Sequence, residues 1–300
     1  MGVLRRTPPR RARRLVAGLA ALALVGACSE RGPGRPDPPD ASHGGVVAGN
    51  FSTNCKRVHS SEDDPIVFPN KPGESHQHDF YGGDPALPDF SSVTYSQLRS
   101  APTGCREPDD TALYWQPSLS LGGREIAPVP LNAYYRNDLD PARVVPFPPD
   151  LRIVAGDSTA SADAPQDLKR VWWSCGRGGP PKQTSPMDCT GTPIGKVTAH
   201  VVFPQCWDGR SIDSVDHRSH MAYPAAGRCP GSHPVQVPKL GLAFRWPIAN
   251  GVGATLSCGS PYCLHADFIN AWDQDRLEEL VRECLVPDVN CNMLTAASDQ

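Results

Sequence analysis

Most of the nine histidines of this sequence lie in four short segments that are rich in polar residues. In the first of these segments, His76 and His78 are two residues apart, so they share a face if the chain is extended there. Two imidazoles on one face are a ready pair of metal ligands. His265 and Asp267 repeat this spacing late in the chain. These residue types predict a site, for metal binding or for acid–base chemistry, that is assembled from distant segments.

The other histidine segments are less specific. His217 and His220 are three residues apart, so their side chains share a face only if this segment turns helically. His233 precedes a proline, where a histidine more often caps a loop than binds a ligand. Asp216 and Asp267 can equally be turn formers. None of the spacings is a diagnostic zinc motif such as His-Glu-x-x-His.

Two sets of candidate site residues follow. The predicted metal ligands are His76, His78, His220, His265 and Asp267. The predicted catalytic or substrate-positioning residues are Asp79, Tyr134, Arg136, Asp216 and His217. Imidazole and carboxylate donors together suit a divalent ion such as zinc, copper or manganese, and the sequence leaves the metal open. Tyrosine and tryptophan can stack on sugar rings, although they equally suit the core of a β-sheet protein.

The N-terminus predicts export. Residues 1–27 contain six arginines followed by a 13-residue apolar run, which is too short to cross a bilayer and is typical of a signal peptide. Val25-Gly26-Ala27-Cys28 matches a bacterial lipobox, so Cys28 is the expected lipidation site. The alternative is an ordinary signal peptide that happens to contain a cysteine. Residues 28–50 are rich in proline and glycine and are expected to form a tether.

Removal of the signal peptide changes the charge of the protein. The 29 basic residues become 23 against 32 acidic ones, so the net charge falls from −3 to −9. This balance argues against a nucleic-acid partner, which would need a basic surface. Attachment to the membrane is expected through the lipid alone. Residues 51–300 are expected to form a single globular domain, because no second linker or fixed-period repeat interrupts them.

Ten cysteines remain besides Cys28, an even number that predicts five disulfides in an exported protein. A zinc–thiolate site is the alternative, but no pair has Cys-x-x-Cys spacing. Pairing of nearest neighbours is the simplest of the many possible connectivities. It predicts the bonds Cys55–Cys105, Cys175–Cys189, Cys206–Cys229, Cys258–Cys263 and Cys284–Cys291.

The predicted fold is mostly β, a sandwich or barrel with many loops and a C-terminal helix. Residues 152–155, 196–203 and 240–246 are short, rich in β-branched or aromatic residues, and bounded by proline or glycine, which predicts strands. One helix is predicted after Asp273, which is a suitable N-cap. Its apolar residues recur at helical spacing, at Leu277, Leu280, Val281 and Cys284.

The sequence also resembles the DUF1996 family of secreted actinobacterial and fungal proteins, whose activity is not established. The matching segments include Ser75-His76-Gln77-His78-Asp79-Phe80-Tyr81-Gly82 and Asp216-His217-Arg218-Ser219-His220-Met221. Further matches lie at residues 64–67, 112–119, 147–152, 203–209, 229–234 and 265–270. The resemblance covers nearly the whole mature chain and implies a secreted single domain, and it transfers no activity. The histidine and aspartate segments lie within these family motifs.

Three functions are compatible with these patterns. The first is a cell-surface enzyme that acts on an extracellular polysaccharide with the help of a divalent metal. The second is a surface protein that binds a glycan or a metal without turnover, and the third is a structural cell-wall protein. No Gly-x-Ser-x-Gly elbow, phosphate-binding loop or dinucleotide motif occurs, which argues against the common α/β serine hydrolases.

Overall fold

The computed structural model describes residues 49–291, and the predicted signal peptide, Cys28 and nearly all of the predicted tether lie outside this part. By their contacts, the described residues belong to one compact unit. No helix within residues 49–291 is long and apolar enough to span a membrane.

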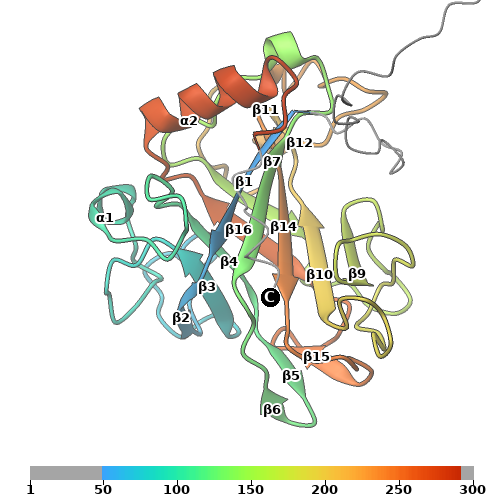
Figure 1. Ribbon diagram of the computed structural model, residues 1–300. Helices are drawn as coiled ribbons and strands as arrows, with labels where there is room; N and C mark the ends of the chain where they lie inside the picture. Colours follow the sequence, from blue (N-terminus) through green and yellow to red (C-terminus); the bar gives the residue numbers. More distant parts are fainter. Residues whose placement is uncertain (1–48, 292–300) are drawn as a thin grey trace, which may run out of the picture. The chain divides into compact units, whose positions relative to one another are not determined.

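Two five-stranded antiparallel sheets form the centre of the fold (Figure 1). The first sheet has the order β1 (Asn50–Cys55), β7 (Leu131–Arg136), β14 (Lys239–Arg245), β10 (Val197–Val202) and β9 (Val171–Cys175). The second has the order β2 (Arg57–Ser61), β3 (His78–Gly82), β4 (Leu113–Pro117), β16 (His265–Ile269) and β8 (Arg152–Gly156).

Smaller elements extend the two large sheets. One three-stranded sheet joins β12 (Met221–Ala222), β11 (Cys206–Trp207) and β13 (Val235–Gln236). Another joins β15 (Ala254–Leu256), β5 (Leu119–Leu121) and β6 (Arg124–Glu125). The helical elements are α1 (Tyr95–Ser100), the 3-10 turn η1 (Pro141–Arg143), α2 (Gln274–Leu280) and the π-helical turn η2 (Val281–Leu285).

The main core lies between the two large sheets. Side chains alternate along a strand, so every second residue of each sheet points inward. Tyr81 of β3 and Phe244 of β14 meet there with ring centroids 5.7 Å apart. Tyr114 and Tyr135 join the same apolar cluster from β4 and β7. The mostly β, sandwich-like prediction is confirmed.

The predicted strands and helix are found close to their expected bounds. Residues 152–155, 196–203 and 240–246 become β8, β10 and β14. Asp273 caps α2, since its carboxylate accepts a hydrogen bond from the Arg276 backbone N–H at 3.1 Å. The apolar stripe from Leu277 to Cys284 is buried against the main core. Its last turn departs from the prediction only in being π-helical.

All five predicted disulfides are present. They join Cys55–Cys105, Cys175–Cys189, Cys206–Cys229, Cys258–Cys263 and Cys284–Cys291. Nearest-neighbour pairing succeeds because most of the bonds close short loops between adjoining elements. The Cys258–Cys263 bond matters for the site, because it lies directly before β16.

Candidate metal centre

The candidate site lies on the outer face of the second sheet, the face turned away from the main core. Most of this face is apolar: Phe80, Trp115 and Val154 form a second, smaller cluster with residues of the covering loops. Register places Phe80, Trp115 and Asp267 side by side across β3, β4 and β16. A carboxylate therefore occupies a position where its neighbours across the sheet are apolar.

The next row across the same face holds two histidines. His78 of β3 pairs with Pro117 of β4, and His265 of β16 pairs with Gly156 of β8. Pro117 and Gly156 have short side chains or none, which leaves room above the sheet for the imidazoles. A Cβ on Gly156 would lie only 2.8 Å from the Cα of His265, and the residue has a φ of +88°, so glycine is required there.

His76 completes a group of three imidazoles. It lies just before β3, and its ring centroid is 4.3 Å from that of His78 and 5.0 Å from that of His265. The ligand atoms of the three histidines lie within 4.8 Å of one another. The predicted convergence of these residues, from positions 76 to 265, is therefore observed.

Backbone carbonyls fix the orientation of two of the rings. His78 Nδ1 lies 2.9 Å from Asp63 O, and His265 Nδ1 lies 2.8 Å from Cys263 O. A carbonyl oxygen only accepts, so each Nδ1 carries the proton in the neutral ring. Each Nε2 then carries a lone pair, which is the arrangement in which a histidine binds a metal.

The two lone pairs face each other. His78 Nε2 and His265 Nε2 are 3.4 Å apart, and His76 Nε2 is buried with no hydrogen-bond partner among residues 49–291. Facing lone pairs repel unless a proton or a cation lies between them. Burial opposes the proton: it lowers the pKa of His76, and together with His76 it lowers the pKa of His265 to about 3. Burial and its two neighbouring imidazoles also lower the pKa of His78 well below its usual value.

Two carboxylates lie against the same histidines. The ligand atoms of Asp64, His78 and Asp267 lie within 4.8 Å of one another. Asp267 is fully buried, and neither of its oxygens has a hydrogen-bond partner among residues 49–291. Burial, with a further contribution from Asp64, raises the pKa of Asp267 well above its usual value. A buried carboxylate without partners is costly, so this position favours either a proton or a cation.

Asp64 lies in the site but is absent from both sets of residues predicted from the sequence. Its Oδ1 accepts hydrogen bonds from the backbone N–H groups of Ile66 and Val67 at 2.9 and 2.8 Å, and burial raises its pKa. These bonds are those of an ordinary turn-forming aspartate, so its spacing gives no sign of a site. The available signal was its place in a segment that matches the family.

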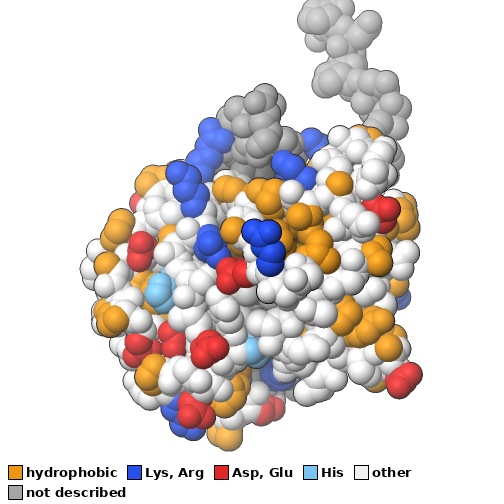
Figure 2. All heavy atoms as spheres, turned by 90° about the horizontal axis from the view of Figure 1, so that it is seen from below, with side chains coloured by type: hydrophobic (Ala, Val, Ile, Leu, Met, Phe, Trp, Pro, Cys, Tyr) orange, Lys and Arg blue, Asp and Glu red, His pale blue; other side chains and the backbone are white. Residues whose placement is uncertain are grey.

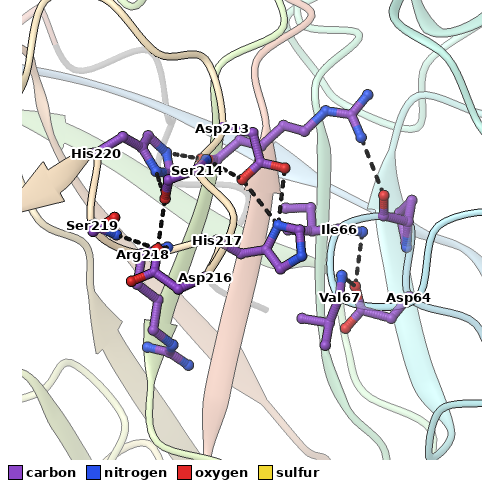
Figure 3. A network of polar contacts seen from close by, with 12 residues as sticks. Asp64, Ile66, Val67, Asp213, Ser214, Asp216, His217, Arg218, Ser219 and His220 are labelled. Carbon is purple, nitrogen blue, oxygen red and sulfur yellow. Dashed lines mark hydrogen bonds and ion pairs between the residues drawn. The ribbon is translucent and has the colours of Figure 1, made fainter.

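His220 does not belong with the converging histidines, contrary to the prediction that it is a metal ligand. Its Nδ1 lies 2.9 Å from Ser214 Oγ and its Nε2 lies 2.7 Å from Arg152 O. Both ring nitrogens are thus occupied by the protein itself. Through Arg152 O, His220 anchors the loop of residues 213–220 to β8. Figure 3 shows its ring beside Ser214 within this loop.

Asp216 and His217 have structural contacts in the same loop (Figure 3). Asp216 is exposed and accepts from the backbone N–H groups of Arg218 and Ser219, which lower the pKa of its carboxyl. His217 Nδ1 lies 2.9 Å from Asp213 Oδ2, and its ring points toward the turn that holds Asp64. The structure places His217 near the cluster and outside both groups of ligand atoms.

The remaining predicted catalytic residues lie elsewhere. Asp79 follows His78 in β3 and so points to the opposite face, where it binds Arg57 at 2.8 Å and Ser60 at 2.5 Å. Tyr134 and Arg136 lie on β7 of the other sheet, with the guanidinium carbon 4.8 Å from the ring centroid. Asp79, Tyr134 and Arg136, which are predicted as catalytic or substrate-positioning residues, therefore do not lie with the three converging histidines.

A pocket adjoins the candidate metal centre at Gly156. It is lined by Gly156, Asp157, Arg170, Arg218 and Tyr223 among others. Arg218 Nη1 donates to Gly156 O at 2.9 Å, and Arg170 lies 3.9 Å from the centroid of the Tyr223 ring. Seen from the end that carries β5, β6 and β15, the surface mixes acidic and basic side chains, and histidine atoms reach it only in small patches (Figure 2).

The comparisons with known proteins identify a family and no function. The family described as domain of unknown function (DUF1996) matches residues 64–272. This match covers more than half of the chain, so the chain belongs to the DUF1996 family. It also contains every residue of the two groups of ligand atoms. No curated protein and no solved structure matches the chain.

Proposed function

We propose that this member of the DUF1996 family is an exported protein that binds a divalent transition-metal ion between His76, His78 and His265. Signal-peptide cleavage and lipid attachment at Cys28 belong to the same proposal. Five disulfides support it, because such bonds persist in oxidising compartments. The metal would be taken up outside the cytoplasm.

One observation carries this proposal: His78 Nε2 and His265 Nε2 face each other at 3.4 Å while both Nδ1 atoms are held by backbone carbonyls. A cation bound by the two lone pairs removes their repulsion and needs no imidazolium in a buried site. His76 supplies a third nitrogen. Asp267 supplies negative charge, as a ligand or as a close neighbour. Nitrogen donors with one carboxylate suit copper or zinc best among the common divalent ions.

The test is the metal content of the protein after purification without chelator. We expect about one ion per chain, as for other histidine sites. The double variant His76→Ala/His78→Ala should lose it, whereas His233→Ala, a histidine in an exposed loop, should keep it. Full metal content in the double variant, measured on protein with native circular dichroism, would refute the proposal.

The pH dependence of binding follows from the buried histidines. Ordinary histidines, with a pKa near 6.5, would release a metal below about pH 6. Here burial lowers the pKa of all three rings, and that of His265 to about 3. Protons therefore compete with the metal only at lower pH, and we expect the ion to be retained at pH 5 in equilibrium dialysis.

Action on an extracellular polysaccharide is a second candidate function. His76 favours it, because its ring is only partly buried, so a metal ion held there could polarise a sugar oxygen or a water at the surface. If this holds, release of reducing ends or unsaturated sugars should be lost in His76→Ala/His78→Ala, which lacks two of the metal ligands. Metal binding without any product from a panel of glycans would instead favour a non-catalytic binding protein. A chain with neither property would favour the structural cell-wall role.

A further inference from the structure

Strand β8 lies at the edge of the second sheet, so one side of its backbone has no neighbouring strand. In an antiparallel pair, residues that hydrogen-bond to the partner strand alternate with residues whose N–H and C=O groups point away from it. Arg152 is of the second kind, because its N–H donates to Ile212 O at 2.9 Å and its C=O lies 2.7 Å from His220 Nε2. Val154, two residues further along β8, therefore also turns its N–H and C=O groups away from β16.

The loop of residues 212–220 occupies this edge on both sides of Val154. It bonds to Arg152 on one side, and on the other Arg218 Nη1 donates to Gly156 O at 2.9 Å. Between them, no hydrogen bond from residues 49–291 reaches the backbone of Val154, although this residue is only 6% exposed. A recessed peptide group without a partner is costly, so this position favours a ligand that supplies both a donor and an acceptor.

The pocket that adjoins the candidate metal centre opens onto this edge. Val154, Ala155 and Gly156 all line it. Side chains of consecutive strand residues point to opposite faces, so three in a row can line one pocket only along their backbone. The pocket has a volume of about 240 Å³, and Asp157 and Arg170 at its wall are exposed. It therefore connects the backbone of Val154 with the surface.

Two arginines line the same pocket. The guanidinium carbon of Arg170 lies 3.9 Å from the centroid of the Tyr223 ring, and its N–H groups form no hydrogen bond within the described part of the chain. Arg218 uses Nη1 for Gly156 O, which leaves its Nε and Nη2 without a partner among the same residues. The fork of N–H groups on a guanidinium matches the two oxygens of a carboxylate.

The acidic side chains of the pocket are engaged by their own turns. Asp157 Oδ1 accepts from the hydroxyl and the backbone N–H of Thr159 at 2.7 and 2.8 Å. Asp167 Oδ1 accepts from the backbone N–H of Lys169 at 2.9 Å, and its Oδ2 lies 3.9 Å from Arg170 Nε, too far for a hydrogen bond. Both arginines therefore keep N–H groups for the anionic group of a ligand.

The space limits this ligand to a short one. The volume is below the range of about 300–1,000 Å³ that is usual for drug-sized ligands. Because the loop occupies the strand edge before and after Val154, an added strand cannot continue along β8. One residue of an extended peptide can still pair with Val154, since it offers an N–H and a C=O on the same side, as in strand addition. A short peptide end with a carboxylate satisfies the backbone and the arginines together.

We propose that this pocket binds the carboxyl-terminal end of an extended peptide. The penultimate residue of the peptide pairs with the backbone of Val154, and its terminal carboxylate binds the guanidinium groups of Arg170 and Arg218. The site is separate from the three histidines, and the proposal does not depend on metal binding.

Titration calorimetry with acetyl-alanyl-alanine, in the presence of EDTA, tests the ligand. The free acid should bind, and its carboxyl-terminal amide should bind about tenfold or more weakly, because the hydrogen bonds to a charged group are lost. Methylation of the first alanine nitrogen removes the donor to Val154 O and should also weaken binding clearly. This second comparison leaves the protein unchanged, so it cannot be confused with a folding defect.

Protein variants test the arginines. Arg170→Gln/Arg218→Gln should weaken binding of the free acid by about tenfold or more and remove the preference for the acid over the amide. The matched control Arg210→Gln/Arg228→Gln removes the same charge from exposed positions outside this pocket and should bind as the wild type does. Arg170→Gln alone serves if loss of the Arg218 contact disturbs the loop of residues 212–220.

Other outcomes would overturn the proposal. Absence of binding by the free acid, or equal binding of acid and amide, would exclude recognition of a terminal carboxylate. Equal affinity for an acetylated dipeptide amide that carries aspartate would assign the ligand carboxylate to an acidic side chain. Equal affinity for galacturonate would exclude a peptide. The variant His76→Ala/His78→Ala should bind acetyl-alanyl-alanine normally, so failure of the metal proposal leaves this one standing.

Discussion

His200 in β10 and His265 in β16 are both buried, and burial is the main cause that lowers the pKa of each to about 3. Their nitrogens differ. His200 Nε2 lies 2.8 Å from Ser174 Oγ, whereas His265 Nε2 faces only another histidine. Burial and a shifted pKa are therefore common to a structural histidine and a candidate ligand. The distinguishing feature is a nitrogen for which the described protein offers no donor.

The largest expected difference between the two regions is in metal affinity. His265→Ala removes one of three nitrogen donors and should weaken binding by about 100-fold or more, since even changes to groups that only support the ligands cost about 10–100-fold. His200→Ala should leave the affinity unchanged. It should instead lower the free energy of unfolding by about 1–3 kcal/mol, because Ser174 loses its partner and Trp172 its stacked ring. Competition with a chromophoric chelator and denaturant unfolding measure the two effects.

If His200→Ala also lost the metal, the presence or absence of a hydrogen-bond partner at Nε2 would not distinguish a structural histidine from a metal ligand. The site would then have to include the outward face of the other sheet. A large loss of stability in His265→Ala without loss of affinity would make His265 a second structural histidine.

The same comparison applies to two buried aspartates of the second sheet. Asp79 is held by Arg57, Ser60 and Gln116, at distances from 2.5 to 3.2 Å, whereas Asp267 has no hydrogen-bond partner among residues 49–291. Asp79→Asn should therefore lower the free energy of unfolding by about 2–3 kcal/mol. Asp267→Asn should change it by less than about 1 kcal/mol in EDTA, because the wild-type side chain gains nothing from hydrogen bonds there.

Metal affinity should show the reverse order. Asp267→Asn is expected to weaken binding by about 10–100-fold, and Asp79→Asn should have no effect. Strong destabilisation of the metal-free protein by Asp267→Asn would mean that its carboxyl group has a stabilising partner after all. Urea unfolding and chelator competition on the same samples decide between these outcomes.

Local rules explain which features could be predicted from the sequence. Nearest-neighbour disulfides, the Asp273 cap and strands bounded by proline or glycine depend on short stretches of chain. The spacing of His76 and His78 and of His265 and Asp267 also sufficed to select the residues that converge. Side chains alternate between the two faces of a strand, so Asp79 must point away from the face that carries His78. The assignment of Asp79 to the site could therefore have been avoided.

The other errors depend on contacts that no local pattern contains. The position of Tyr134 and Arg136 relative to the histidines is set by the strand order, which puts β7 in the other sheet. His220 is occupied by the carbonyl of Arg152, which is 68 residues away in sequence. Asp64 reaches the site only because the loop before β3 folds over the outer face of the second sheet.

The smallest expected effect on metal affinity concerns the disulfides beside the two histidines. The Cys258–Cys263 bond encloses the carbonyl that orients His265, since Cys263 O accepts from Nδ1. Replacing both cysteines by serine frees a short loop and should lower the free energy of unfolding by about 2 kcal/mol. The less constrained carbonyl should also weaken metal binding, by about tenfold or less.

The Cys175–Cys189 bond is the matched control, because Cys175 adjoins Ser174, the partner of His200. Its loop is longer, so the corresponding double serine variant should lose more stability, about 3 kcal/mol, yet bind metal with the wild-type affinity. Affinities are compared at a temperature where both variants are folded by circular dichroism. Equal affinities in the two variants would show that Cys263 does not position His265, and its ring would then be held by packing in β16 alone.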